Sequence, residues 1–107
     1  MTDTLPEPVA RLIAATNAGD LEAFLDTFAS DGVVDDWGRK FHGRSAIQGW
    51  SDNEYLGKQV TLDVTSVDNT STDTIVVAKV GGNGFNGPST FTFTVAGDTI
   101  RAMVIRE

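Results

Sequence analysis

The chain has 107 residues, a length typical of one domain, and its composition is that of a globular protein, with 40% hydrophobic and 21% charged residues. Fifteen acidic against eight basic side chains give a net charge of −7, which argues against nucleic acid and anionic membranes as partners. Cysteine is absent and there is one histidine, which excludes disulfides, thiolate metal sites and histidine-rich metal sites. We therefore expect no metal or other cofactor.

The chain also lacks the marks of a membrane or exported protein. No apolar run approaches the roughly 20 residues of a membrane-spanning helix. The first ten residues have neither the basic segment nor the apolar segment of a signal peptide. These features predict a cytoplasmic protein in which residues 1–107 form a single domain.

The first part of the chain has the periodicity of helices. Residues 9–16 place apolar side chains at the spacing of one helix face. Thr4 and Glu7 have the spacing of a capping box at the start of this helix, and Gly19 can adopt the left-handed conformation that ends it. Asp20 has the side-chain chemistry to cap a second helix.

The second helix is predicted to run through Phe28, whose spacing continues its apolar face, and to end at residues 30–32. A short strand over residues 33–37 follows. A third helix is predicted over residues 44–50, and residues 51–57 predict one further capped turn.

The second half of the chain alternates apolar and polar residues, as strands do. Strands are predicted over residues 60–65, 75–80, 90–95 and 100–105, and the unbroken β-branched run of the second suits a strand covered on both faces. The glycines of residues 81–88 spell G-x-G-x-x-G, but a strand follows them, which favours a wide hairpin over a dinucleotide-binding turn. Helices followed by strands predict an α+β fold, with helices packed on one face of a mainly antiparallel sheet.

Asp36 is the residue with the clearest chemical potential. Neighbouring strand residues point to opposite faces, so Asp35 and Asp36 cannot share a proton in a regular strand. If Val34 faces the core, Asp36 does too, and burial would make it a stronger base because burial disfavours a charged carboxylate. No lysine or arginine is obviously placed to oppose this effect. The alternative is an aspartate at a strand end that bonds to the next turn.

Four motifs between residues 9 and 47 carry a family resemblance. They are Asn17-Ala18-Gly19-Asp20, Phe28-Ala29-Ser30-Asp31, Val34-Asp35-Asp36 and Gly43-Arg44-Ser45-Ala46-Ile47. This segment resembles the start of a nuclear-transport-factor-2-like domain, and the later strands fit that fold in number and order. The superfamily includes ketosteroid isomerases and SnoaL-like polyketide cyclases. The resemblance implies a cone-shaped α+β barrel with a pocket between the helices and the concave face of the sheet.

The resemblance also assigns roles to single residues. Asp36 falls at the position of the general-base aspartate of ketosteroid isomerase. Leu12 stands where that family has a tyrosine that donates to the oxyanion, and Ser89 stands roughly where it has a neutral aspartic acid. The resemblance thus implies a base without the usual oxyanion donors. No Asp-Arg-Asp set of the kind found in limonene-epoxide-hydrolase-like members is evident.

Resemblance and periodicity together predict an apolar, aromatic pocket wall with few polar groups. Asp36 is the predicted catalytic residue, and the predicted substrate-binding residues are Leu12, Thr16, Phe28, Phe41, Trp50, Tyr55, Ser89 and Phe91. For the large apolar members of this set, the alternative is that they fill the core. Trp37 is predicted at the rim or at a dimer edge, and Phe85 is predicted to cover the pocket or a partner subunit. His42 is expected to be exposed rather than catalytic.

Two functional hypotheses follow. The first is an isomerase, cyclase or hydratase in which Asp36 moves a proton on an apolar small molecule that bears a carbonyl group. The second is a non-catalytic domain that binds an apolar ligand or serves dimerisation. Family members commonly pair through the outer face of the sheet, which here carries Thr90, Thr92 and Thr94, so a homodimer is expected.

Overall fold

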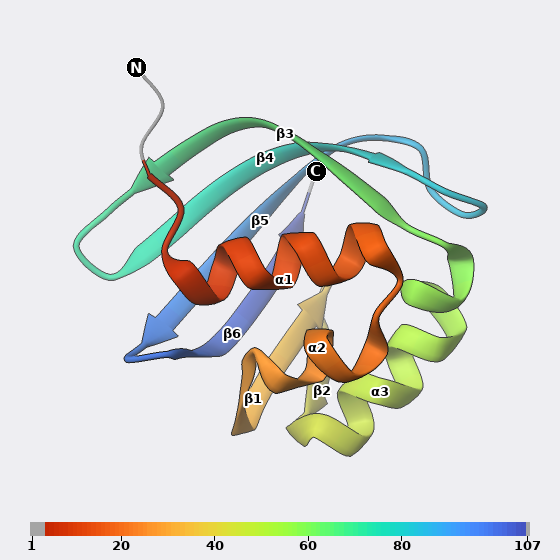
Figure 1. The fold of residues 1–107 in the computed structure, drawn as a ribbon, viewed down its shortest axis with the longest axis horizontal. Coiled ribbons are helices and arrows are strands. Elements are labelled where there is room, and N and C mark those ends of the chain that lie inside the picture. Colours follow the sequence, from red (N-terminus) through yellow and green to blue (C-terminus); the bar gives the residue numbers. More distant parts are fainter. Residues whose placement is uncertain (1–3, 107) are drawn as a thin grey trace.

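The computed structural model describes residues 4–106 as three α-helices, one short 3₁₀ helix and one six-stranded sheet (Figure 1). The helices are α1 (Glu7–Ala18), α2 (Leu21–Asp26), α3 (Gly43–Glu54) and the 3₁₀ helix η1 (Leu56–Lys58). The strands are β1 (Phe28–Asp36), β2 (Arg39–His42), β3 (Thr61–Asn69), β4 (Asp73–Gly81), β5 (Gly87–Ala96) and β6 (Thr99–Arg106).

The sheet has the strand order β2-β1-β6-β5-β4-β3. Only the pair β1 and β6 is parallel, and the other neighbours are antiparallel. Figure 1 shows the sheet curving around α1, with α3 beside β1 and β2. The predicted α+β fold, with helices on the concave face of a mainly antiparallel sheet, is confirmed. No helix within residues 4–106 is long and apolar enough to cross a membrane.

The ends of the first helices test the capping predictions. Gly19 adopts the left-handed conformation, with φ of 68°, and its N–H bonds to carbonyls of the last turn of α1. Asp20 caps α2 by accepting a hydrogen bond from the Ala23 N–H at 3.1 Å. The capping box at Thr4 and Glu7 was wrong: Pro6 is the N-cap, so Glu7 begins the helix and is too early to close a box.

The second helix is shorter than its apolar spacing predicted. The Thr27 hydroxyl bonds to the Phe24 carbonyl at 2.7 Å, and the Thr27 carbonyl accepts from the Ile100 N–H at 2.8 Å. The chain therefore leaves the helix at Thr27 and enters the sheet at Phe28. A bulge between Phe28 and Val33 then aligns the rest of β1 with β6.

Three further expectations need correction. Residues 51–54 continue α3 instead of capping a new turn, and residues 56–58 form η1. Strand β2, at residues 39–42, was not predicted because it is mostly exposed and polar. Strand β4 is covered on one face only, since its burial alternates along the strand. Its β-branched residues therefore belong to two different faces.

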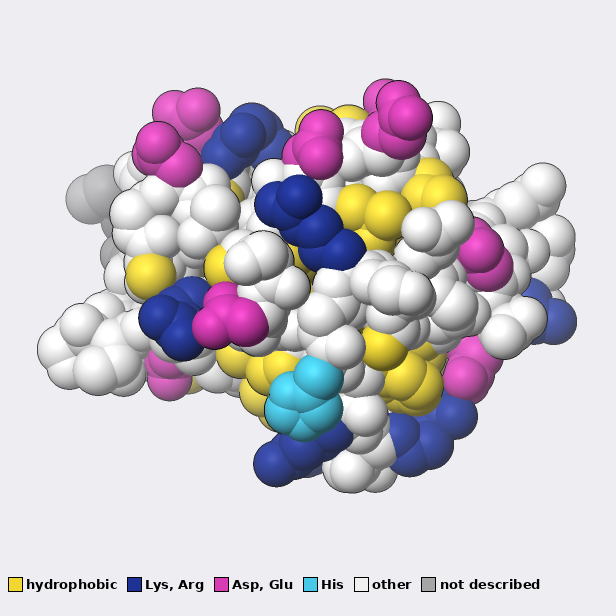
Figure 2. Space-filling view, turned by 90° about the horizontal axis from the view of Figure 1, so that it is seen from below, with side chains coloured by type: hydrophobic (Ala, Val, Ile, Leu, Met, Phe, Trp, Pro, Cys, Tyr) yellow, Lys and Arg dark blue, Asp and Glu magenta, His cyan; other side chains and the backbone are white. Residues whose placement is uncertain are grey.

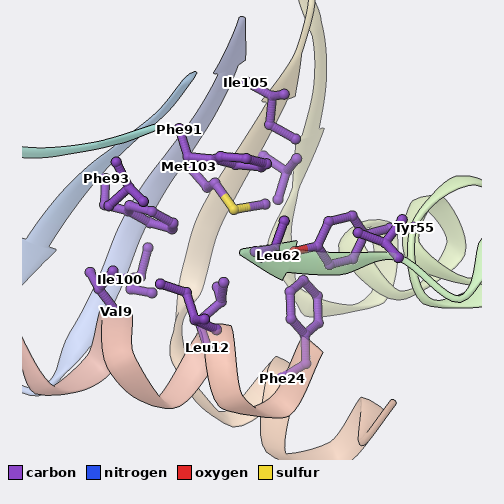
Figure 3. Close-up of a cluster of buried hydrophobic side chains, with 14 of the residues drawn as sticks. Val9, Leu12, Phe24, Tyr55, Leu62, Phe91, Phe93, Ile100, Met103 and Ile105 are labelled. Carbon is purple, nitrogen blue, oxygen red and sulfur yellow. The ribbon is translucent and has the colours of Figure 1, made fainter. Parts of the chain in front are cut away.

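The core lies between the helices and the concave face of the sheet (Figure 3). Val9 and Leu12 of α1 are fully buried, as are Phe93 of β5 and Ile100 and Met103 of β6. Alternation along β5 and from Met103 onward in β6 places the large side chains on the inner face, opposite the threonines of β5. Ile100 reaches the same face because the pairing of β5 with β6 shifts register just after it. The helix periodicity and the strand alternation therefore meet in one core.

We predict that Gly57→Ala destabilises the protein by about 1–3 kcal/mol, because an added Cβ would overlap the Asp52 carbonyl group and displace η1. Gly49→Ala is the matched control: it lies in the interior of α3 with open space around it, and it should stabilise the fold by roughly 0.5–1 kcal/mol. Urea unfolding measures both. Equal stabilities for the two variants would contradict the packing of η1 on α3.

Candidate functional site

A cavity of about 340 Å³ lies at the end of the sheet where β1 and β6 finish and β5 begins. The end of α3, η1 and the β4–β5 hairpin complete its wall. Its volume falls in the range of small-molecule sites. Five aromatic side chains line it, namely Trp37, Trp50, Tyr55, Phe85 and Phe91. Its polar side chains are Asp36, Glu54, Lys58 and Ser89.

The structure brings together five of the residues predicted for the site. Asp36, Trp50, Tyr55, Ser89 and Phe91 all line the cavity. Asp36, Ile105 and Phe91 sit in register on neighbouring strands, so they form one row across the sheet. Their shared position follows from the alternation that the sequence displays. Whether they bind a substrate remains a prediction.

The other predicted contacts lie elsewhere. Leu12 and Phe28 are fully buried in the core, and Thr16 is buried beside them. Phe41 packs against Trp50, with ring centroids 6.1 Å apart, on the side away from the cavity lining. These side chains therefore lie behind the cavity wall and do not form it. For Leu12 and Phe28 this agrees with the alternative that they fill the core.

A continuous series of aromatic rings connects the cavity to the core. Trp50 stacks on Tyr55, with centroids 4.9 Å apart and planes inclined by 23°. Tyr55 contacts Phe24 at 5.2 Å, and Phe24 meets Phe28 edge-on at 5.3 Å. Such contacts add to the burial energy of each ring. The cavity wall is thus anchored through α3, α2 and β1.

The Tyr55 hydroxyl belongs to the core. It lies 2.9 Å from Thr16 Oγ1, and the Thr16 hydroxyl also bonds to the Leu12 carbonyl. Burial strongly raises the pKa of Tyr55, because the phenolate would lose its hydration. The phenol is therefore a neutral, satisfied group, and only its ring faces the cavity.

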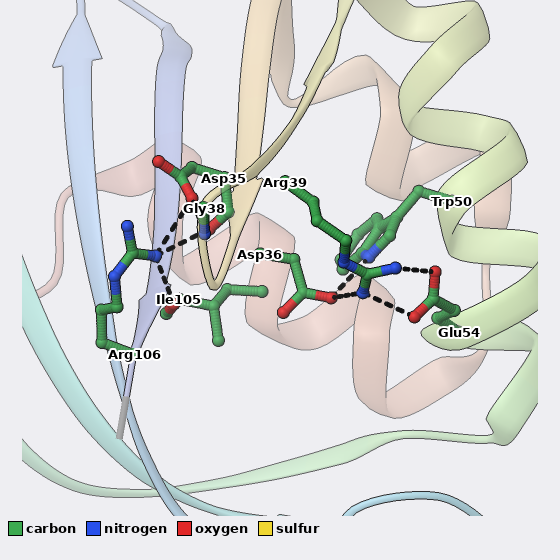
Figure 4. Close-up of polar contacts among 8 residues, drawn as sticks. All are labelled: Asp35, Asp36, Gly38, Arg39, Trp50, Glu54, Ile105 and Arg106. Carbon is green, nitrogen blue, oxygen red and sulfur yellow. Dashed lines mark hydrogen bonds and ion pairs between the residues drawn. The ribbon is translucent and has the colours of Figure 1, made fainter.

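Asp36 is held through one of its two carboxylate oxygens (Figure 4). Trp50 Nε1 donates to Asp36 Oδ2 at 3.0 Å, and Arg39 donates to the same oxygen at 2.7 Å. Within residues 4–106, no hydrogen bond reaches Asp36 Oδ1. The side chain is 17% exposed. One oxygen is thus fixed by the protein and the other remains open to a ligand.

Arg39 corrects the expectation that no cation stands beside Asp36. Its guanidinium also bonds to both carboxylate oxygens of Glu54, at 2.7 and 2.9 Å. The result is an Asp–Arg–Glu set that sequence reasoning missed. The guanidinium favours the charged carboxylate of Glu54 and opposes the effect of burial there. Arg39 accordingly holds the pKa of Glu54 below its usual value.

The sequence spacing of Asp36, Arg39 and Glu54 is consistent with this set. It becomes informative only once strand β2 and the full length of α3 are known. Asp36 and Arg39 are paired across the two-residue turn between β1 and β2. Glu54 follows Trp50 by four residues on α3, which places both on one helix face. Recognition of strand β2 and of the longer α3 would have brought the three charges together.

Asp35 serves the opposite side of the strand (Figure 4). Its carboxylate accepts hydrogen bonds from Arg106 at 3.0 Å and from the Gly38 N–H at 2.7 Å. The Arg106 guanidinium, aided by the Gly38 bond, lowers the pKa of Asp35. Asp35 therefore fixes the turn that carries Trp37 and places Asp36 on the cavity side, as the alternation predicted.

Ser89 contributes a hydroxyl to the cavity wall. The residue is 5% exposed, and its hydroxyl makes no hydrogen bond within residues 4–106 but is not sealed from solvent, since no described side-chain N or O atom is both buried and unpaired. A hydroxyl can both donate and accept, so a ligand is a suitable partner for it. Ser89 and Asp36 Oδ1 are the two protein groups in the cavity wall with evident unused hydrogen-bonding capacity and little exposure.

His42 lies outside the cavity, where it begins α3 as the N-cap without a side-chain bond. Figure 2 shows the histidine side chain, in cyan, standing on the surface. In the part of the chain that the structure describes, no three His, Asp or Glu side chains converge as metal ligands would. The polar chemistry of the site therefore rests on carboxylates, a hydroxyl and cations.

The chain has the nuclear-transport-factor-2-like fold. A Cytophaga hutchinsonii protein described as NTF2-like has 12% identity and a TM-score of 0.79, over 98% of this chain and 92% of its own. A Mycobacterium tuberculosis protein solved in complex with estradiol-17β-hemisuccinate has 17% identity and a TM-score of 0.79, over 92% and 88% of the two chains. Both likenesses concern the fold.

Within that fold class, the SnoaL-like domain model matches residues 9–103, so the chain belongs to the SnoaL-like family. A proposed polyketide cyclase from Sinorhizobium meliloti is 28% identical, with a TM-score of 0.87 over 95% of each chain. No protein with a curated description matches the sequence significantly. The family resemblance expected from the four motifs is thereby confirmed.

We predict that Asp35→Asn lowers stability near neutral pH and makes it less dependent on pH. The folded pKa of Asp35 lies below its ordinary value of 3.8. Its contribution is therefore fully present above that value and is lost as the pH falls through the folded pKa. Urea unfolding at about pH 6 and about pH 3 should show that the variant loses more stability relative to wild type at the higher pH.

The matched control is Asp68→Asn, at an exposed position on β3. It should leave the difference in stability between the two pH values close to that of wild type. An Asp35→Asn variant with the same pH dependence as wild type would show that the Arg106 pair does not stabilise the fold.

Proposed function

We propose that the protein binds a small, largely apolar molecule bearing a carbonyl group in this cavity, and that Asp36 transfers a proton on it. One observation carries the proposal: a carboxylate in an aromatic cavity has one oxygen fixed by Trp50 and Arg39 and the other open. The reaction class is isomerisation, cyclisation or hydration without a cofactor. The S. meliloti relative described as a proposed polyketide cyclase supports this class.

The chemistry begins at the carbon next to the carbonyl. Asp36 Oδ1 accepts a proton from that carbon, the electron pair of the C–H bond forms a C=C bond, and the π pair of the carbonyl group moves to its oxygen to give an enolate. The Ser89 hydroxyl is the group in the wall suited to donate a hydrogen bond to that oxygen. Isomerisation is complete when Asp36 returns the proton to another carbon of the same molecule. Geometry matters first for such a base, and fixing Oδ2 orients Oδ1.

A non-catalytic ligand-binding role is the second candidate, and two observations favour it. Leu12 is buried in the core where ketosteroid isomerases have a donor tyrosine, so that donor is missing. Arg39 and Trp50 both hold Asp36 Oδ2, as they would hold a structural, non-catalytic carboxylate. In this role, Asp36 and Ser89 would orient a ligand by hydrogen bonds alone.

The complex of the M. tuberculosis protein suggests a steroid as a first probe. We predict that the wild-type protein in D₂O accelerates deuterium exchange at the carbons next to the ketones of progesterone, followed by NMR. Asp36→Asn keeps the shape and removes the base, so exchange should fall by about 10²-fold or more while affinity changes little.

Asp68→Asn is the control, because it makes the same change at an exposed position on β3, outside the cavity lining. It should retain exchange activity in the folded state. If wild-type protein binds progesterone without accelerating exchange, the catalytic role of Asp36 is contradicted for this probe and the ligand-binding role is favoured.

We also propose that the protein is a homodimer formed through the outer face of the sheet. The described helices lie on the other face, and the outer side chains Thr90, Thr92 and Val104 are half-buried within the single chain. Two-fold pairing is the commonest closed arrangement of identical chains. A face rich in β-branched side chains is suited to such pairing.

Sedimentation equilibrium at micromolar concentration should give about twice 11.4 kDa. Thr92→Lys places like charges on the paired faces and should give the monomer mass. Glu22→Lys, at an exposed position on α2, is the control that should remain dimeric. A monomeric wild-type protein would refute the assembly.

A further inference from the structure

Trp37 and Phe85 are exposed aromatic side chains that both border the cavity. They are 59% and 58% exposed, and among the described residues they are the exposed large hydrophobic side chains. Water-exposed aromatic rings contribute little to folding, and an isolated one needs no explanation. Here the two come from different hairpins and meet at one cavity, which points to a common ligand.

Trp37 has a backbone conformation that is unfavourable for a bulky side chain. It forms the β1–β2 turn with Gly38, and both residues have positive φ, of 54° and 90°. This is the conformation of a type I′ turn, in which Asn-Gly is the preferred pair. A bulky residue with positive φ is uncommon, and such strain concentrates at functional sites.

The protein nevertheless holds this turn firmly. Asp35 Oδ1 accepts from the Gly38 N–H at 2.7 Å, and the Trp37 N–H donates to the Ile105 carbonyl at 3.3 Å. The Asp36–Arg39 ion pair closes the same turn from the other side. The strained backbone keeps the Trp37 ring at the edge of the cavity, directly beside the candidate base.

Phe85 is positioned by its own hairpin. Its ring lies over Gly87, where an added Cβ would come within 3.3 Å of the ring. The Asn83 N–H donates to the Lys58 carbonyl at 2.8 Å, and the Asn83 side chain donates to Gln59 at 3.0 Å. These bonds fasten the hairpin to the turn at residues 58–59. Phe85 therefore stands at the cavity on a constrained loop.

The two rings approach the cavity from separate sides. Strands β1 and β4, which lead into their turns, are separated by β6 and β5. Three strand spacings correspond to roughly 14 Å between the two backbones. Trp37 and Phe85 thus border the cavity from different hairpins, with Ile105 and Phe91 on the strands between those hairpins.

We propose that Trp37 and Phe85 form an aromatic rim that binds the outer, apolar part of the ligand, so that the ligand is a flat polycyclic or aryl molecule with its polar end inside. This inference rests on the proposed function, which identifies the cavity as the binding site. It adds the chemical class of the ligand. The inner polar groups, Asp36 and Ser89, meet the carbonyl end. The rim selects for an extended ring system over a short-chain ketone.

The test uses Nile red, a neutral and flat polycyclic carbonyl compound, in fluorescence titrations with the full chain. Trp37→Asn restores the preferred Asn-Gly turn and should keep or raise the melting temperature while weakening Nile red binding by about tenfold or more. Phe85→Ser should weaken binding to a similar extent with an unchanged melting temperature. Trp37→Phe is the conservative control and should bind within about threefold of wild type.

Sedimentation of the same variants separates ligand binding from contact with a second copy of the chain. The rim proposal expects the mass of Trp37→Asn and Phe85→Ser to equal that of wild type. The proposal is overturned if either folded variant binds Nile red with wild-type affinity. It is also overturned if Trp37→Asn unfolds at a much lower temperature than wild type, or if either variant sediments as a monomer while wild type is a dimer. Loss of Nile red binding in the rim variants, with progesterone exchange unaffected by Asp36→Asn, would uphold the rim and refute the catalytic role.

Discussion

The hydrogen bond from the Trp50 indole to Asp36 Oδ2 joins helix α3 to strand β1, and the form of the cavity depends on it. On one side it fixes the carboxylate, together with Arg39. On the other it fixes the indole ring, which stacks on Tyr55 and through it reaches the core at Phe24. The cavity wall is therefore an extension of the core packing. A shift of α3 would open the aromatic series and release Asp36 at the same time.

Some polar groups of the site have hydrogen-bond partners within the chain, and others do not. Asp36 Oδ2, Glu54 and the Tyr55 hydroxyl all have partners within the chain. Ser89 and Asp36 Oδ1 lack one in the described residues. Neither oxygen is sealed from solvent, because no described side-chain N or O atom is both buried and unpaired, so water hydrates them until a ligand takes its place. The turn at Trp37 is not optimised for stability. Its positive φ suits asparagine better than tryptophan.

Periodicity predicted most of the fold. One-faced spacing placed α1, and alternation placed β3 and β5 with the correct inner faces, because burial on a single face gives a regular apolar pattern in the sequence. Phe28 shows the limit of this reasoning. Its helical spacing was correct, but the Thr27 carbonyl pairs with Ile100, a residue distant in sequence that no local pattern includes. Tertiary pairing decided the end of α2.

Site residues on the strands could be predicted from the sequence, whereas a site residue positioned by a turn could not. The parity of β1 placed Asp36 inside and Asp35 outside, and family resemblance led to Trp50 and Phe91. Arg39 was missed because its position depends on a tight turn with Trp-Gly in place of the familiar Asn-Gly. Leu12 and Phe28 were assigned to the pocket because inward direction alone does not distinguish a cavity wall from a filled core. That distinction depends on the packing of α1 and α2 over the sheet.

A crystal structure of the protein soaked with progesterone tests the central claim most directly. The account predicts the steroid inside the cavity, with a ketone oxygen within hydrogen-bonding distance of Ser89 Oγ and the adjacent carbon facing Asp36 Oδ1. The outer rings should lie against Trp37 and Phe85. A steroid bound elsewhere on the chain, or one in the cavity that leaves both Ser89 and Asp36 without contact, would contradict the account.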